Sequence, residues 1–284
     1  MPGLQKRMAG FTLIEAIIVM VITGILGALV ASFAAPLRGY FDAAARADLS
    51  DVADTALRRM ARELHAALPN SVRVSGGYIE FLPTITGGRY RAGPASSGTV
   101  QCGGTLAQDI LDFTAADTCF EVIGGLPAAP AAGEEIVIYN TTPGAVYAGD
   151  NVAEIAAGST TGSIMFASKQ FPFESPGIAG ESKPSGQRFQ VIGKPVTYAC
   201  SGATLWRYSG YARQPVQPAS IAVLDGLAGA VKARLATGVN CADSRFVYTP
   251  GVTNRAGLVT MSLTLSNSSD SVTLLHQVHV QNVP

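Results

Sequence analysis

The chain has 284 residues, of which 48% are hydrophobic and 14% charged, with 20 basic and 20 acidic side chains. This hydrophobic content excludes a disordered protein, and a formal net charge of zero argues against a nucleic-acid-binding protein, which needs a basic surface. The 31 glycines and 16 prolines favour a β-containing body rich in loops over a helical bundle.

An apolar run follows the basic residues Lys6 and Arg7 and the small pair Ala9-Gly10. From Ala16 to Leu37 no residue is charged, and at about 1.5 Å per residue this stretch spans about 30 Å of hydrocarbon. We therefore predict a leader over 1–10 and a transmembrane helix over 11–37. The basic leading residues put that end in the cytoplasm and the rest of the chain outside it. Because the small residues precede the apolar run, cleavage there would leave the helix on the mature chain, unlike cleavage of a secretory signal.

Glu15 stands near the start of this apolar run. A carboxylate in a bilayer-spanning helix costs on the order of 3 kcal/mol and usually has a partner. The alternative is a plain single-pass anchor in which the positive end of the helix dipole stabilises Glu15.

Helical periodicity continues beyond the apolar run, and we predict an amphipathic continuation over 38–69. Its apolar stripe consists of Leu49, Val52, Ala56, Met60, Leu64 and Leu68. The helix is expected to end at Leu68, because Pro69 disfavours helical geometry in the residue before it. A helix from Phe11 to Leu68 would be roughly 85 Å long. Pro36 and Gly39 are the expected kink.

Alternating patterns after Pro69 predict a β-rich head domain over 70–284. Strands are expected at 71–75, 78–82, 135–140, 163–166, 188–192, 196–200, 204–208, 259–265 and 272–280. The last two form a predicted hairpin, and a short helix or irregular segment is expected over 221–235. Long loops occupy much of 85–185, including a basic and aromatic loop at 87–91 that is expected to be a solvated loop.

The chain has four cysteines, Cys102, Cys119, Cys200 and Cys241, with no spacing typical of metal ligands. Two disulfides are the preferred interpretation, and four buried thiols are the alternative. Four cysteines allow three connectivities, of which we prefer Cys102 with Cys119 and Cys200 with Cys241 because local closure is the simplest. Disulfides would place the head in an oxidising compartment.

No pattern in the chain points to catalysis, a metal or a cofactor. His276 and His279 lie three residues apart in a predicted strand, so they point to opposite faces and do not make a metal pair. A nucleophile elbow, a phosphate-binding loop and paired catalytic carboxylates are absent from the sequence. The aromatic residues Tyr198, Trp206, Tyr208 and Tyr211 are expected on a sheet face rather than as a carbohydrate platform.

The run Gly10-Phe11-Thr12-Leu13-Ile14-Glu15 resembles the processing motif of type IV prepilins and of type II secretion pseudopilins. The resemblance implies that prepilin peptidase cuts after Gly10 and methylates the new amino group of Phe11. It implies that Glu15 pairs with the terminal amine of a neighbouring subunit during assembly. The implied fold is α+β and type IV pilin-like, with a long N-terminal helix packed on an antiparallel β-sheet head with long loops. Major pilins of this family usually have a proline near the position of Ser32, whereas this chain has Pro36.

Three further stretches, LLHQVHVQNVP, YACSGATLWRY and FVYTPG, resemble minor pilins of the mannose-sensitive haemagglutinin (MSHA) pilus system, of the MshO type. This resemblance implies a low-abundance subunit that acts in pilus initiation or at the tip. Its implied partners are prepilin peptidase, the major pilin, other minor pilins, the inner-membrane assembly platform and membrane lipid. The chain would sit in the inner membrane with a periplasmic head before it enters the filament. A J-type minor pseudopilin and a tip adhesin or DNA receptor are the alternatives.

Overall fold

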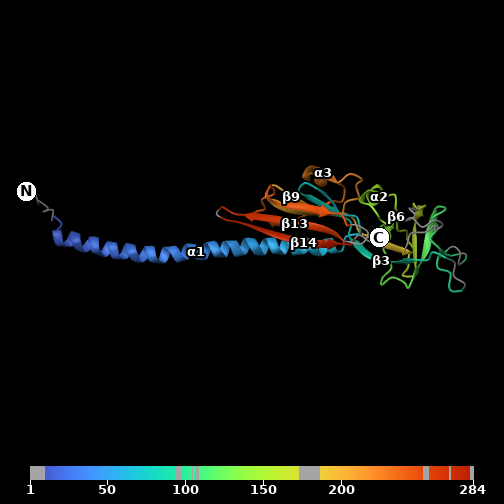
Figure 1. The fold of residues 1–284 in the computed structure, drawn as a ribbon, viewed down its shortest axis with the longest axis horizontal. Helices are drawn as coiled ribbons and strands as arrows, with labels where there is room; N and C mark the ends of the chain where they lie inside the picture. The colour runs from blue at the N-terminus through green and yellow to red at the C-terminus, as the bar shows by residue number, and fades with distance from the viewer. Residues whose placement is uncertain are drawn as a thin grey trace, which may run out of the picture.

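The computed structural model describes residues 10–93, 97–103, 105, 109–172, 186–251, 256–268 and 270–281, without the side chains of 33–39 and 41. The molecule is elongated: one long helix leads into antiparallel β-sheets, and the far end of the molecule is a second β lobe (Figure 1). The predicted α+β class, with a long N-terminal helix before an antiparallel β head, is confirmed.

Helix α1 (Leu13–His65) has 53 residues and is therefore about 80 Å long. Its first half projects away from the sheets and its second half packs against them (Figure 1). The helix ends three residues before the predicted Leu68, because the next residues pair with a strand segment instead. Ala67 forms a β-bridge with Pro83, and the Leu68 amide donates to the Leu82 carbonyl at 2.7 Å. The kink expected at Pro36 and Gly39 stays a prediction: α1 runs as one continuous helix through both residues.

The proximal lobe consists of the second half of α1 and two antiparallel sheets. The five-stranded sheet has the order β1 (Arg73–Ser75), β2 (Tyr78–Phe81), β9 (Val196–Ser201), β10 (Thr204–Ser209) and β11 (Val231–Thr237). The three-stranded sheet has the order β12 (Arg245–Thr249), β13 (Gly257–Ser266) and β14 (Ser271–Val280). The predicted hairpin at the C-terminal end is β13 with β14, in register from Gly257 opposite Val280 to Ser266 opposite Ser271.

The core of the proximal lobe forms between one face of α1 and the inner faces of both sheets. Ala53 and Ala56 are buried beside Met60 and Leu64, so small side chains let the helix approach the strands closely. An ion pair of 2.8 Å joins Arg46 of α1 to Asp270 in the turn between β13 and β14. Helix and sheets thus form one packed unit from about residue 45 onward.

The distal lobe is built on a six-stranded antiparallel sheet and helix α2 (Pro143–Ala148). Its strand order is β6 (Val152–Glu154), β5 (Glu135–Ile138), β8 (Arg188–Ile192), β3 (Thr84–Tyr90), β4 (Asp117–Ile123) and β7 (Ser163–Lys169). Its core is rich in aromatic rings, with Phe120 and Phe189 packed edge to face at a centroid distance of 5.0 Å. This lobe has its own hydrophobic core at the end of the molecule away from α1.

Several predictions from the sequence are corrected here. The segment 87–91 was expected to be a loop, but Gly87 to Tyr90 belong to β3. A Cβ on Gly87 would come within 2.9 Å of the Phe189 carbonyl oxygen on the neighbouring strand, so this glycine permits strand packing rather than a turn. The segment 221–235 divides into the short helix α3 (Ile221–Gly226) and the start of β11. Strands β3, β4, β6, β11 and β12 were not predicted.

A two-stranded ribbon joins the lobes. β2 pairs with β9 in the proximal lobe, and their continuations β3 and β8 pair in the distal lobe. The two segments that link β2 to β3 and β8 to β9 pass from one sheet to the other at the same level, where the Gly193 amide donates to the Pro83 carbonyl at 2.9 Å. Proline cannot donate to a β ladder, so Pro83 and Pro195 fall where each strand leaves its sheet.

A buried polar cluster, the junction, lies where the lobes meet; it consists of Arg73, Glu80, Tyr147, Tyr211 and Thr197. Arg73 pairs with the fully buried Glu80 at 2.6 Å and stacks over the Tyr147 ring at 3.5 Å from its centroid. Tyr211 donates to Glu80 at 2.9 Å, and its hydroxyl lies 2.6 Å from that of Thr197. Burial raises the pKa of both tyrosines, which keeps their hydroxyls protonated as donors. The junction therefore connects β1, β2, β9 and α2 through satisfied buried groups.

Candidate functional site

The predicted processing segment lies at the exposed N-terminal end of α1. Gly10 and Phe11 precede the helix, and Thr12 is its N-cap in an extended conformation. The Thr12 hydroxyl accepts from the Glu15 amide at 3.3 Å, which is half of the capping box that the spacing Thr-x-x-Glu favours. The residues on both sides of the predicted cut are thus placed just outside the first helical turn.

The predicted cleavage position is sterically free. Phe11 is 82% exposed, and a Cβ built on Gly10 would meet no atom within 4 Å. Nothing in the described part of the chain therefore requires glycine at position 10. The basic residues Lys6 and Arg7 lie outside the described residues.

Glu15 occupies the first turn of α1 on an exposed surface. No other side chain of the described residues pairs with its carboxylate, and it is the one charged residue in the apolar segment Leu13–Ser32. Its position near the N-terminus lets the helix dipole stabilise it in part, by about 0.3–1 kcal/mol for an exposed site. This stabilisation is smaller than the cost of about 3 kcal/mol that the charge would have in a membrane. A positive group from another molecule could therefore stabilise the carboxylate further.

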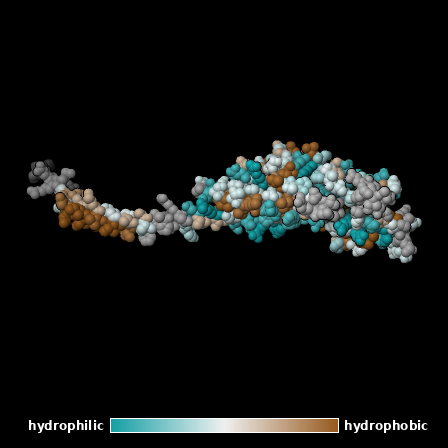
Figure 2. Space-filling view, in the orientation of Figure 1, coloured by the Kyte–Doolittle hydropathy of each residue, from teal (hydrophilic) through white to brown (hydrophobic). Residues whose placement is uncertain are grey.

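The segment Leu13–Ser32 is long and apolar enough to cross a membrane, and none of it is buried against the rest of the protein. Figure 2 shows this apolar surface along the N-terminal part of α1. Its two hydroxyl side chains that bond within the helix do not interrupt it: Thr23 donates to the Val19 carbonyl at 2.7 Å and Ser32 to that of Leu29 at 2.8 Å. Polar groups satisfied in this way are tolerated in lipid.

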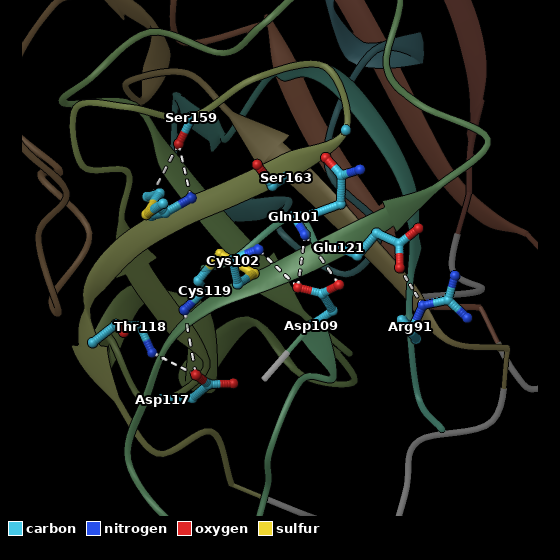
Figure 3. Close-up of a disulfide and its surroundings, with 12 residues drawn as sticks. Arg91, Gln101, Cys102, Asp109, Asp117, Thr118, Cys119, Glu121, Ser159 and Ser163 are labelled. Carbon is cyan, nitrogen blue, oxygen red and sulfur yellow. Dashed lines mark hydrogen bonds and ion pairs between the residues drawn. A yellow bond between two sulfur atoms is a disulfide. The ribbon is translucent and has the colours of Figure 1, made fainter. Parts of the chain in front are cut away.

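Both disulfides are present with the pairing preferred from the sequence. Cys200 on β9 joins Cys241 in the loop after β11, and Cys102 joins Cys119 on β4. Figure 3 shows the second of these beside Asp109, whose carboxylate accepts from the Gln101 and Cys102 amides at 2.7–3.1 Å. The Cys102–Cys119 bond and Asp109 together fix the segment before β4 on the distal lobe.

Removing the Cys200–Cys241 bond by a double substitution to alanine is expected to lower the free energy of unfolding by about 2–4 kcal/mol, because the bond closes a long loop in the unfolded chain. The sequence separation is 41 residues here and 17 for the other bond, so the Cys102→Ala/Cys119→Ala variant should lose less. Guanidinium unfolding of the full chain in detergent, followed by fluorescence of the single Trp206, measures both. Equal stability of wild type with and without reductant would contradict this expectation.

The two histidines of β14 lie as expected for a strand. His276 is half-buried and His279 exposed, on alternate faces. Within the described residues, no group of three or more His, Cys, Asp or Glu side chains has the geometry to hold a metal ion. Tyr198 and Tyr208 are fully buried and Trp206 half-buried, on the five-stranded sheet. Arg89, in the segment expected to be a loop, is exposed on β3.

One feature of the head was not predicted: a cleft of about 550 Å³ in the distal lobe, beside α2. Its walls come from the ends of β5 and β7 and from the segments before β4 and after α2. Residues so far apart in sequence carry no common motif. The one local signal is the turn-forming run at 140–144, Asn-Thr-Thr-Pro-Gly.

Comparison with known proteins bears on the N-terminal segment. A family model described as the prokaryotic N-terminal methylation motif matches residues 5–31, which include Gly10, Phe11 and Glu15. No curated protein and no solved structure matches the chain significantly. The match supports a type IV pilin-like prepilin that is a substrate of prepilin peptidase, and proteins with this motif are structural proteins. The chain thus carries a prepilin methylation motif at the start of a membrane-length helix, on a type IV pilin-like α+β fold.

Proposed function

We propose that this protein is a minor pilin of an MSHA-type type IV pilus, of the MshO type, that acts in pilus initiation or in the tip complex. The prepilin part of the proposal is supported by the match of residues 5–31 to the methylation motif, which runs into an unburied apolar helix. The MSHA part is supported by the resemblance of the stretches LLHQVHVQNVP, YACSGATLWRY and FVYTPG. The large head with two lobes fits a subunit placed where few copies are needed. Prepilin peptidase removes residues 1–10 and methylates Phe11.

In this proposal the chain is first a membrane protein and then part of a filament. The span over 11–37 holds it in the inner membrane, with the leader in the cytoplasm and the head over 70–284 in the periplasm. About 20 Å of helix separates Ser32, at the end of the apolar segment, from Arg46, where the head is first held by an ion pair. The continuation over 38–69 therefore serves both as a spacer and as the base of the head.

Glu15 supplies the assembly signal. Its carboxylate has no partner among the described side chains, and the terminal amine of Phe11 in a neighbouring subunit offers the opposite charge. In low dielectric a paired charge is far less costly than a lone one. The free-energy cost of the Glu15 charge in the membrane is therefore offset only when the subunit docks against another chain.

Glu15→Ala is expected to leave processing unchanged and to reduce incorporation into filaments at least tenfold, because the docking charge is lost while the helix and cap remain. The measurement is immunodetection of the subunit in sheared, purified pili and in the membrane fraction. Thr23→Ala is the matched control, because the Thr23 hydroxyl bonds only within its own helix. Full incorporation of Glu15→Ala would refute the pairing role.

Cross-linking of the full-length chain in cells, followed by peptide mapping, tests the choice of machine. Cross-links to the major and minor pilins of an MSHA-type pilus support the proposal. Cross-links to type II secretion pseudopilins instead would assign the chain to that machine as a J-type subunit.

A further inference from the structure

The cleft in the distal lobe has the size and lining of a ligand site. Its volume of about 550 Å³ lies within the roughly 300–1,000 Å³ typical of small-molecule sites. Three aromatic side chains, Phe113, Tyr139 and Phe171, line it together with several polar groups. Helix α2, which contributes to its wall, belongs to the distal lobe, at the end of the molecule away from the N-terminal half of α1 (Figure 1).

One of the three aromatic rings, that of Tyr139, belongs to a residue with a strained backbone. Tyr139 directly follows β5 and has a φ of 50°, in the left-handed region that a non-glycine residue with a bulky side chain rarely adopts. Strain of this kind costs on the order of 1–3 kcal/mol and is concentrated at ligand sites. On the other wall, Gly149 (φ 88°) ends α2 and turns the chain into Asp150 and Asn151.

Asn151 provides an acceptor that the protein itself does not use. Its side chain is buried, with 3% exposure, and Nδ2 donates to the Ile138 carbonyl and to Asn140 Oδ1, both at 3.2 Å. These two bonds fix which end of the amide is which, and Oδ1 is left without a partner among the described residues. An unpartnered buried carbonyl costs about 1–3 kcal/mol, which a donor brought by a ligand would offset.

Two opposite charges accompany this acceptor. The exposed Asp150 carboxylate has no partner in the described part of the chain. Lys169 Nζ donates to the Gly149 carbonyl at 3.0 Å, which leaves two of its three N–H groups for a ligand. The cleft therefore offers both donors and acceptors, with no excess of either charge.

We propose that this cleft binds a neutral, hydroxyl-rich saccharide, a role that goes beyond subunit assembly. Sugar hydroxyls both donate and accept, as Asp150, Asn151 and Lys169 together require. The C–H faces of a sugar ring are weakly positive and match the negative faces of aromatic rings such as Tyr139. A phosphate or nucleotide would bring two or more negative charges to a cleft in which Asp150 already balances Lys169, and a purely apolar ligand would leave the buried Asn151 acceptor unpaired.

The test uses the full-length chain in a zwitterionic detergent, which has no sugar headgroup, and a panel of neutral trisaccharides of glucose, galactose, mannose and N-acetylglucosamine. Saturation-transfer NMR and calorimetry measure binding. At least one trisaccharide should bind, and Asp150→Asn should weaken it at least tenfold. Glu154→Gln is the matched control, because Glu154 is an exposed carboxylate on β6 outside the cleft.

A second variant tests the ring. Tyr139→Asn removes the aromatic face but tolerates the left-handed backbone, so the fold should be kept, as Trp206 fluorescence melting will show, while binding is lost. Failure of every trisaccharide to bind, or wild-type binding by both cleft variants, overturns the proposal. Stronger binding of inorganic phosphate than of any trisaccharide also overturns it. Since binding is measured on the isolated chain, these outcomes do not affect the assembly role.

Discussion

Chains in which Gly10 is replaced by leucine are expected to accumulate in the membrane at their unprocessed mass, with at least a tenfold loss of the processed form. The physical reason lies outside the fold of this chain. A Cβ at position 10 meets nothing within 4 Å, so the substitution should not disturb α1 or its cap. The remaining reason for glycine at position 10 is the peptidase, because its own groups must come close to the scissile backbone, which a side chain there would hinder.

Intact-mass measurement of the membrane fraction, with and without co-expressed prepilin peptidase, distinguishes the two forms. The processed form should begin at Phe11 and carry one added methyl group. Gly27→Leu is the matched control, because Gly27 is also free of contacts but lies about four helical turns beyond the cut. Complete processing of Gly10→Leu, or blocked processing of Gly27→Leu, would contradict the assignment of the cleavage site.

Glu80→Ala is expected to lower the free energy of unfolding by about 3–5 kcal/mol, because it leaves the charge of Arg73 unpaired in a largely buried site. Arg73 is 15% exposed and Glu80 0%. The Tyr211 hydroxyl loses an acceptor in the same substitution. Since the junction holds both lobes, this loss should appear as destabilisation of the whole head rather than of one sheet.

Guanidinium unfolding followed by Trp206 fluorescence measures this loss. The double variant Arg73→Met/Glu80→Met should recover much of it, because removing both charges leaves no lone ion to bury. Arg58→Ala serves as a surface control: its pair with Asp54 on α1 is exposed and should contribute less than about 1 kcal/mol. A loss below about 1 kcal/mol for Glu80→Ala would show that the junction does not hold the lobes together.

Strongly periodic segments were predictable because their pattern is local. The apolar stripe that includes Met60 and Leu64 faces the sheets, and the alternating residues of β13 fill the same core. In both elements every inward position is apolar, so the period alone shows which face is buried. The disulfide pairing was also accessible, because short loops close more readily than long ones.

Strands β3 and β4 were missed because their signals are ambiguous. Gly87 and Gly88 suggest a turn, yet in β3 they allow close packing against Phe189 of the adjacent strand. The pairing partner that requires these glycines lies about 100 residues further along the chain, and no local window contains it. Propensity was overridden by a long-range contact, which is common for strands.

By itself, the sequence determined the N-terminal motif, the membrane-length helix with its single charge at Glu15, and the α+β class, because each depends on neighbouring residues and on the solvent around them. Only the tertiary structure decided the division of the head into two lobes, the junction of Arg73 and Glu80, and the cleft. These features join residues from strands distant in sequence, and their chemistry arises from burial. Asn151 shows the difference: in the sequence it is one polar residue in a loop, and in the fold its buried Oδ1 is an acceptor without a partner among the described residues.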